Sequence, residues 1–296
     1  MSVTINTNVD SIKIQNCLLK STDQLSTSME RMSTGLKVNS AKDDVAGVII
    51  AARMDVQLSG NSIAQDNVQS GNAMLSTAEG NIDVVLDNLV RIRDLTLQAS
   101  NGTNSSTEIT AMQKEVNERI KEINRISDSS KYASFNLFGS GTDLATNGAI
   151  LQVGSDKEEC NTIKASEEIF KSIKFQDLDK SKVLTEGYNL TTLVREAGGS
   201  KITFSAALGA LDNAIDNISI RKSQIGSAQN RLASALDNLI VQHVNLSSAK
   251  SIIVDADIAS EASKYTQASI LQQVSTALLA QANKGSALQV STALLS

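Results

Sequence analysis

The chain has 296 residues, which is enough for one large domain or two smaller ones. It contains no proline and no tryptophan, and only three tyrosines and five phenylalanines. Because proline breaks helices and aromatic side chains fill thick cores, this composition favours a mainly α protein with thin helical packing. The net charge of −5 and the lack of a basic cluster argue against nucleic acid as a partner.

Cysteine usage and hydropathy exclude further classes. The two cysteines, Cys17 and Cys160, are too few for a disulfide framework, and their spacing suits no metal site. The start of the chain, MSVTINTNVDSIKIQN, has neither a basic region nor an apolar segment, so we expect no secretory signal peptide. No run approaches the roughly 20 apolar residues of a membrane span. Secretion would therefore need a dedicated export machine.

Residues 1–36 carry a helical pattern that ends in an elbow. The apolar positions keep the three-four spacing of a coiled-coil seam, with Thr22 as its one polar member. Gly35 predicts the end of this helix, because glycine enters the left-handed C-cap conformation without a steric penalty. Ser40 is expected to cap the next helix, with Asp43 reaching back to it. The seam positions are Leu18, Leu25, Met29, Met32 and Leu36.

The longest predicted helix covers about residues 44–99. Its apolar positions alternate steps of three and four without a slip, as in a coiled coil. Gly60, Gly71 and Gly80 lie inside it, and each costs about 1 kcal/mol relative to alanine. We therefore expect close approach of a neighbouring backbone at these glycines. The seam comprises Val68, Gly71, Leu75, Ala78, Ile82, Val85, Leu89 and Ile92.

A second, shorter helix is predicted to fold back on the first. Asn101–Asn104 forms a turn, and Ser105 with Glu108 makes a second candidate capping box. The apolar pattern then continues to about Ser127. Because the turn is short, we expect the two helices to lie antiparallel.

The character of the chain changes between about residues 129 and 199. The segments 149–153 and 161–164, separated by a turn at Gly154–Asp156, predict a small β-hairpin. Residues 167–199 show no clear pattern. Six of the eight aromatic residues gather in this middle region: Tyr132, Phe135, Phe138, Phe170, Phe175 and Tyr188.

The last hundred residues return to helix. Fourteen positions from Leu208 to Ile253 alternate steps of three and four, and ten of them are Leu or Ile, which indicates a long seam. The segment Asp255–Asp257 interrupts this pattern, and a further helix follows with an apolar face of Leu271, Val274, Leu278 and Ala282. The four polar positions of the long seam are Lys222, Gln229, His243 and Lys250.

No pattern of catalytic residues stands out. The single histidine, His243, lies on the seam, where a packing or register role is expected. The segment Gly139–Gly141 lacks the third glycine of a phosphate-binding loop. The acidic pairs Asp43-Asp44 and Asp255–Asp257 could hold a cation, but capping and the helix dipole already explain carboxylates at helix starts. We predict no active site, no cofactor and no metal, and expect that the protein is not an enzyme.

Helical ends that flank a non-helical middle imply that the chain runs out, turns and comes back. The two terminal segments are then expected to pack beside each other. A bundle this thin leaves apolar side chains uncovered, and these need other chains. The pattern therefore favours a self-assembling rod, with a cytosolic coiled-coil scaffold as a competing interpretation. The uncovered side chains are expected to include Leu86, Leu95, Ile240 and Leu279.

The run RMSTGLKVNSAKDDVAG at residues 31–47 resembles the N-terminal signature of bacterial flagellins. Further segments resemble that family in order along nearly the whole chain. The tail departs from the family pattern, because KGSALQVSTALLS follows Ala282-Asn283 where family tails usually run QVPQNVLSLL. The matching segments are LVRIRDLTLQASNGTNSS, LQVGS followed by NTI, IGSAQNRLASALDN, NLSSAKS, VDADIASEAS and ILQQVSTALLAQAN.

The resemblance implies a structural subunit that polymerises with itself into the bacterial flagellar filament for motility. The implied fold is mainly α, a long antiparallel coiled coil or helical bundle with a small β-hairpin at about 149–165. An inner discontinuous domain of 1–44 with 256–296 would accompany a core domain of 45–255, without variable outer domains. A hook–filament junction (hook-associated) protein is the alternative, and the closeness of the terminal motifs to flagellin disfavours it.

The resemblance also implies partners and a location. The subunit would leave the cell through the flagellar type III export apparatus without a cleavable signal peptide, assisted by a chaperone on its C-terminal segment. Outside the cell, on the bacterial flagellum, it would meet the filament cap and hook-associated proteins. In flagellins recognised by Toll-like receptor 5 three residues form the core of the epitope, and they match Arg91, Leu95 and Glu115 here. The residues expected to carry assembly are Leu18, Leu25, Met29, Met32, Leu271, Val274 and Leu278.

Overall fold

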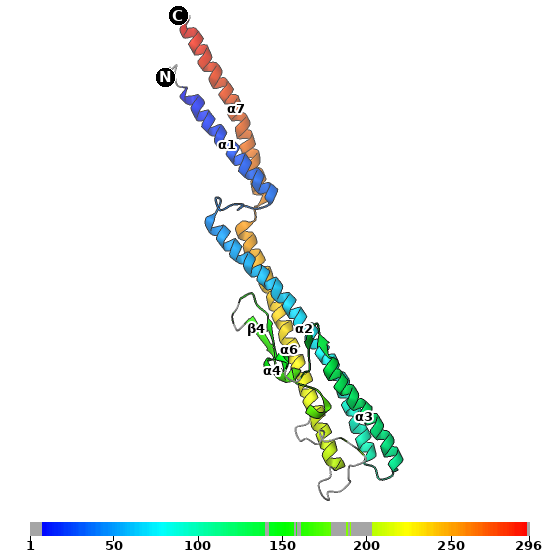
Figure 1. Ribbon diagram of the computed structural model, residues 1–296. Coiled ribbons are helices and arrows are strands. Elements are labelled where there is room, and N and C mark those ends of the chain that lie inside the picture. The colour runs from blue at the N-terminus through cyan, green and yellow to red at the C-terminus, as the bar shows by residue number, and fades with distance from the viewer. Residues whose placement is uncertain are drawn as a thin grey trace. The chain divides into compact units, whose positions relative to one another are not determined.

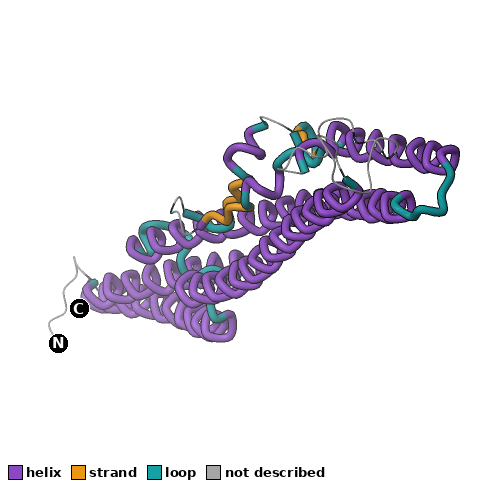
Figure 2. Tube along the Cα trace, turned by 90° about the horizontal axis from the view of Figure 1, so that it is seen from below, coloured by secondary structure: helices purple, strands orange, loops and turns teal. Residues whose placement is uncertain are grey.

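A computed structural model describes residues 8–139, 142–156, 158, 161–178, 188, 190 and 203–294, with side chains as far as residue 284 (Figure 1). The described chain is mainly helical, with two small antiparallel strand pairs (Figure 2). It divides into two compact units, Met1–Leu58 with Val244–Ser296, and Ser59–His243. The elements are α1 (Val9–Thr34), α2 (Val45–Ala99), α3 (Ser106–Ser129), β1 (Lys131–Tyr132), β2 (Phe135–Asn136), α4 (Asp143–Asn147), β3 (Ala149–Gln152), β4 (Thr162–Ala165), α5 (Glu167–Phe170), a 3₁₀ turn (Phe175–Asp177), α6 (Phe204–Val254) and α7 (Ile258–Leu294).

In the first unit, α1 and α7 pack side by side, which confirms the predicted pairing of the terminal segments (Figure 1). The seam between them differs from the prediction. Met29 and Thr22 are exposed, and the serines one residue earlier are buried instead. Small side chains at a helix contact let the two helix axes come close, which leaves the larger apolar side chains at the outside. The buried seam residues are Ser11, Ser21 and Ser28 on α1 and Glu261, Ala268 and Ser275 on α7.

Backbone hydrogen bonds join the elbow after α1 to the α6–α7 junction within the same unit. Gly35 has φ 73°, and its N–H donates to the Arg31 carbonyl at 2.9 Å, so the predicted left-handed C-cap is confirmed. The Gly35 carbonyl accepts from the Ala256 N–H at 2.9 Å, and the Lys37 N–H donates to the Val254 carbonyl at 2.6 Å. The two interruptions predicted from sequence therefore satisfy each other's backbone groups.

The predicted cap of α2 is wrong by four residues. Helix α2 begins at Val45, and the Asp44 carboxylate accepts from the Gly47 N–H at 3.0 Å, as an N-cap does. Ser40 and Asp43 do contact each other, since the Asp43 carboxylate accepts from the Ser40 N–H at 2.9 Å and from its hydroxyl at 3.0 Å. That contact closes the turn before the helix. Asp43 therefore accepts the hydrogen bonds of the turn, and Asp44 accepts the hydrogen bond from the first turn of the helix.

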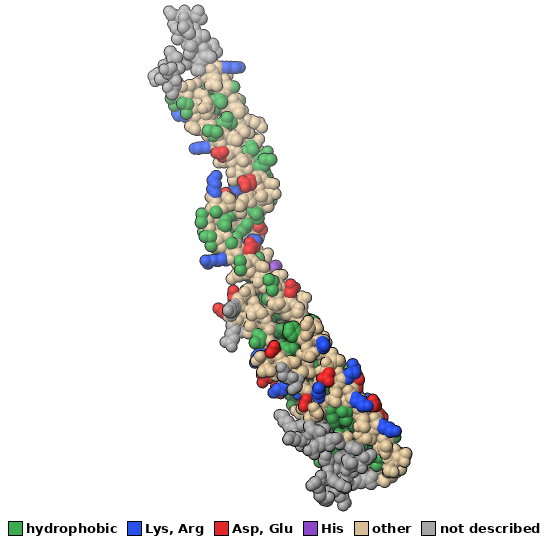
Figure 3. All heavy atoms as spheres, viewed as in Figure 1, with side chains coloured by type: hydrophobic (Ala, Val, Ile, Leu, Met, Phe, Trp, Pro, Cys, Tyr) green, Lys and Arg blue, Asp and Glu red, His purple; other side chains and the backbone are tan. Residues whose placement is uncertain are grey.

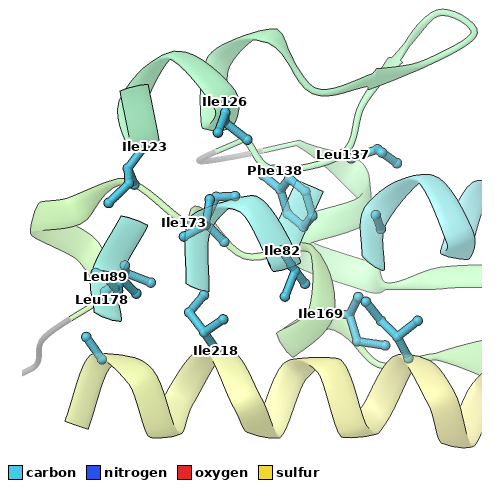
Figure 4. Packing of buried hydrophobic residues seen from close by; sticks show 14 of the residues in the cluster. Ile82, Leu89, Ile123, Ile126, Leu137, Phe138, Ile169, Ile173, Leu178 and Ile218 are labelled. Carbon is cyan, nitrogen blue, oxygen red and sulfur yellow. The ribbon is translucent and has the colours of Figure 1, made fainter. Parts of the chain in front are cut away.

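The second unit is built around the predicted seam of α2. Every predicted seam position from Val68 to Ile92 is buried. Figure 4 shows side chains of α2, α3 and α6 converging with residues from the middle of the chain. Burial of apolar surface stabilises the folded unit by about 25 cal/mol per Å², and this seam contributes to that burial. The fully buried residues of the whole cluster include Leu75, Ile82, Leu89, Ile123, Phe138, Ile169, Phe170, Ile173 and Ile218.

Polar interruptions in the α6 seam face acidic residues on α2. The Lys222 ammonium lies 2.7 Å from the Asp83 carboxylate, and the Gln229 amide donates to the Glu79 carboxylate at 3.1 Å. In the first unit, Lys250 and Asp55 form a corresponding pair at 2.5 Å. These exceptions to the heptad therefore pair α6 with α2 and help to specify their register.

The predicted β-hairpin is confirmed as β3 and β4, with Ala149 opposite Ala165 and Gln152 opposite Thr162. It lies against α2 at two of the three predicted glycines. A Cβ on Gly71 would lie 2.5 Å from the Leu151 side chain. The expectation is wrong for Gly80, because a Cβ there would meet nothing within 4 Å. The residues 179–187 and 191–202, within the segment that gave no clear pattern, lie outside the described residues, as does Cys160.

The middle of the chain is tied to α3 by buried polar side chains. The Gln113 amide donates to the Tyr188 carbonyl at 3.1 Å and accepts from the Leu190 N–H at 2.5 Å. The Asn124 side chain accepts from the Phe175 N–H at 3.1 Å, and the Phe175 and Tyr188 rings meet edge to face at 5.6 Å. Burial raises the pKa of the Tyr188 hydroxyl to about 12. These bonds satisfy backbone groups of Phe175, Tyr188 and Leu190 beside α3.

Gly60→Ala and Gly80→Ala form a matched pair inside α2. A Cβ on Gly60 would lie 2.7 Å from the Ser155 Cβ and 3.1 Å from its Cα, whereas Gly80 faces open space. We expect Gly80→Ala to raise the free energy of unfolding of the monomer by about 1 kcal/mol through helix propensity. Gly60→Ala should lose that gain, because the hairpin must shift. Urea denaturation measures both, and equal stabilisation would contradict docking of the hairpin on α2.

Candidate functional site

The first candidate site is an ion pair that joins α2 to α3. The Arg91 guanidinium donates from Nε to Glu115 Oε1 at 2.9 Å and from Nη2 to Oε2 at 3.3 Å, which is a bidentate arrangement. The antiparallel hairpin predicted from sequence brings these side chains together, 24 residues apart in the chain. Their side chains remain 47% and 37% exposed, so the pair is accessible in the single chain.

Two residues that sequence reasoning missed hold this pair in place. Arg119 donates to Glu115 Oε1 from Nε at 3.2 Å and from Nη2 at 3.1 Å. Its Nη1 reaches across to the Asn88 side-chain oxygen at 3.1 Å, and the Asn88 amide donates to the Val84 carbonyl at 2.8 Å. The i,i+4 spacing of Glu115 and Arg119 was a signal for this contact. The role of Asn88 depends on α3 lying beside α2.

Leu95, the third predicted recognition residue, lies in the core. It was expected to be uncovered, and that expectation is wrong, because Leu95 is 3% exposed and belongs to the main hydrophobic cluster. Its side chain stabilises the hairpin that carries Arg91 and Glu115. The packing of α3 and of the middle of the chain on α2 covers more of α2 than a simple coiled coil would.

The charge distribution favours the ionised forms of this site. The hydrogen bond from Arg91 holds the pKa of the Glu115 carboxyl below its usual value, with Arg119 acting in the same direction and partial burial opposing both. The same bond raises the pKa of the Arg91 guanidinium. The surface therefore presents one carboxylate shared between two guanidinium groups, with an excess of positive charge.

The second candidate site is the outer face of the terminal helices. On α1, Leu18, Leu25 and Met32 are half-buried, whereas Met29 is 59% exposed. On α7, the predicted assembly residues are exposed, and Leu271 lines a shallow groove together with Ile270. Apolar side chains show at the surface along the chain (Figure 3). The exposed α7 residues are Leu271 (45%), Val274 (48%) and Leu278 (52%).

Sequence reasoning missed several members of this face. Leu19 is 63% exposed on α1, and Ile270 is 55% exposed on α7. Their signal was a second apolar stripe beside the first, which a search for one seam overlooks. Among the residues that the structure describes, no group of acidic, histidine or cysteine side chains could hold a metal ion. None of the described helices is long and apolar enough to cross a membrane.

Acid should loosen the α2–α3 hairpin through Glu115. Because its folded-state pKa is lowered, the ion pair contributes stability at neutral pH that is lost as the pH falls from about 4.5 through the lowered value. We expect Glu115→Gln to reduce this acid sensitivity in hydrogen exchange of α3 amides. Glu118→Gln is the control, since Glu118 pairs only with Lys121 within α3 among the described ion pairs. Equal effects of the two variants would contradict the role of Glu115.

Comparisons with known proteins match both helical ends of the chain. The bacterial flagellin N-terminal helical region matches residues 5–142, and the bacterial flagellin C-terminal helical region matches residues 208–290. The flagellin of Xenorhabdus nematophila is 34% identical over 308 residues, covering 96% of this chain and 97% of that protein. The flagellin of Bacillus subtilis strain 168 is 31% identical, covering 95% and 96%.

A solved structure shares the fold at lower identity. A Vibrio parahaemolyticus protein described as flagellar hook-associated aligns with a TM-score of 0.54 over 72% of this chain and 99% of that one, at 16% identity. That likeness concerns the fold alone. The flagellar filament 30.7 kDa core protein of Treponema maltophilum is 31% identical, covering 94% of this chain and 95% of that protein. With near-complete coverage of relatives at this identity, the chain belongs to the bacterial flagellin family.

Proposed function

We propose that the chain is a structural subunit that polymerises with itself into an extracellular flagellar filament for motility. The observation that carries this proposal is the packing of the terminal helices. Serines and one carboxylate fill the α1–α7 seam, while Leu271, Val274 and Leu278 remain exposed on α7. Apolar stripes on a helix pair need a partner surface, and further copies of the chain supply one in a repeating assembly.

The proposed domains follow the elbow. Residues 1–44 with 256–296 would form the inner domain, and residues 45–255 the core domain. The hydrogen bonds between Gly35 and Ala256 and between Lys37 and Val254 support a joint at this point. The two compact units divide elsewhere, inside α2 and α6, at Leu58/Ser59 and His243/Val244. The domain boundaries at the elbow remain a prediction.

The proposed partners beyond the filament come from family membership. Export through the flagellar type III apparatus, a chaperone on the C-terminal segment, and contacts with the filament cap and hook-associated proteins are expectations of that kind. A hook–filament junction role is the weaker candidate. The hook-associated structure shares the fold at 16% identity, whereas relatives named flagellin reach 34%.

Replacing apolar side chains on the outer face of α7 should block polymerisation without unfolding the subunit. We expect Leu271→Gln combined with Leu278→Gln to lower filament yield strongly in electron microscopy and sedimentation. Helical circular dichroism should be unchanged, because both side chains are about half exposed in the single chain. Gln273→Ala, at an exposed polar position of the same helix, is the control. Normal filaments from the double variant would remove α7 from the proposed interface.

We also propose that the monomer is recognised by Toll-like receptor 5 of animal hosts through Arg91 and Glu115. The bidentate pair is accessible in the single chain, and it joins α2 to α3. Leu95 would contribute indirectly, because its burial in the core stabilises the hairpin that carries the pair. The resemblance to recognised flagellins implies that this epitope is buried in the filament, so we expect soluble monomer to activate the receptor and intact filament to do so poorly.

Arg91→Ala tests this recognition. Loss of a charge-assisted contact should cost on the order of 1.5–3 kcal/mol of binding free energy, which is about tenfold or more in affinity. Arg93→Ala is a matched control, because Arg93 is a similarly exposed α2 arginine that pairs with Asp212 on α6 at 2.5 Å. Receptor activation by the folded monomers is the readout. An Arg91→Ala monomer as active as Arg93→Ala would contradict the proposal.

A further inference from the structure

The sequence contains two Asn-Gly dipeptides, Asn101-Gly102 and Asn147-Gly148. In this dipeptide the glycine backbone nitrogen can attack the asparagine side-chain carbonyl carbon, because no side chain on the second residue obstructs it. The reaction needs an exposed glycine N–H that is free of hydrogen bonds, and a backbone that can bring the two atoms together. The sequence alone makes both sites equivalent, and the tertiary structure separates them.

Asn101-Gly102 lies in the turn between α2 and α3. Asn101, Gly102 and Thr103 are all exposed. The Asn101 side-chain oxygen accepts from the Thr103 N–H at 3.5 Å, an Asx turn that folds the amide over the Gly102 peptide. In the described part of the chain, the Gly102 N–H donates no hydrogen bond. The attacking nitrogen is therefore accessible and close in sequence to an oriented carbonyl carbon.

At Asn147-Gly148 the asparagine is also exposed, but the glycine is buried and its N–H is hydrogen-bonded. Asn147 is the last residue of α4, and the Gly148 N–H donates to the Leu144 carbonyl at 3.0 Å. Gly148 is buried, and its position is confined, because a Cβ there would lie 2.3 Å from the Ala165 carbonyl oxygen. Attack would require this N–H to lose its bond and the backbone to leave β4. A buried hydrogen bond of this kind raises the barrier.

We propose that Asn101 is a site of spontaneous covalent modification, by deamidation through a succinimide, and that Asn147 is protected. The Gly102 nitrogen forms a bond to Asn101 Cγ, the Cγ–Nδ2 bond breaks, and ammonia leaves with the proton from the Gly102 nitrogen. Water then adds to one of the two succinimide carbonyls and opens the ring to aspartate or isoaspartate. The balance is one water consumed and one ammonia released, with no oxidant or reductant.

The product changes the turn chemically. Each conversion adds a negative charge just after the end of α2 at Ala99, where the helix dipole disfavours an anion. Isoaspartate also inserts a methylene group into the backbone, in the turn where the Asn104 N–H donates to the Asn101 carbonyl at 3.4 Å. The modified turn should therefore hold α2 and α3 together less well than the original one.

The test compares the two sites in the same full-length protein. Purified monomer is incubated for days at mildly alkaline pH, under native conditions and in denaturant, and peptides are mapped by mass spectrometry and isoaspartyl methyltransferase labelling. Conversion adds about 1 Da to the peptide. We expect native Asn101 to convert at least about tenfold faster than native Asn147, because the Gly148 hydrogen bond must be broken first. In denaturant both sites should convert at similar rates.

Asn101→Gln provides the matched control, because the longer side chain must form a less favourable six-membered ring. That variant should lose the fast native product and leave Asn147 unchanged. Native rates that are equal at the two sites would overturn the proposal. So would an Asn101 that stays intact in the native monomer while converting in denaturant.

Discussion

Burial of the apolar seam of α2 is the constraint on which the second unit depends. Leu75, Ile82 and Leu89 are fully buried, and they contribute to one cluster that includes residues of α3, α6 and the middle of the chain. Ala149 and Ile163 of the β-hairpin, and Tyr188, belong to the same cluster. Polar seam positions favour one register, because it places Lys222 opposite Asp83 and Gln229 opposite Glu79.

Helices α1 and α7 differ from α2, because small and polar side chains rather than large apolar ones are buried between them. Their mutual seam contains Ser28 and Ser275 together with the Glu261 carboxylate, which lies 3.4 Å from Arg31 and 2.8 Å from Lys264. The larger apolar side chains lie outside that seam. A helix pair of this type gains little from internal apolar burial, and most of its apolar surface remains available. Its stability and its proposed assembly should therefore be coupled.

The α2–α3 hairpin shows how one motif serves several roles. The Ser105–Glu108 capping box begins α3, as predicted, while Leu95 and the α2 seam are buried in the core. Arg91 and Glu115 remain partly exposed to solvent as a bidentate pair on that support. The resemblance to flagellins points to Arg91 and Glu115, whereas only the structure shows that Leu95 is buried and that Asn88 supports the pair through Arg119.

The sequence by itself determined the helices, the Gly35 stop, the β-hairpin and the pairing of the ends, because periodicity and glycine conformation are local properties. It could not place Leu95 inside or Leu271 outside, and it made Gly60 and Gly80 equivalent. Each of those outcomes depends on which element packs on a given face of a helix. Only the tertiary structure decides that, because several stripes on one helix compete for burial and the volume of the neighbouring side chains selects among them.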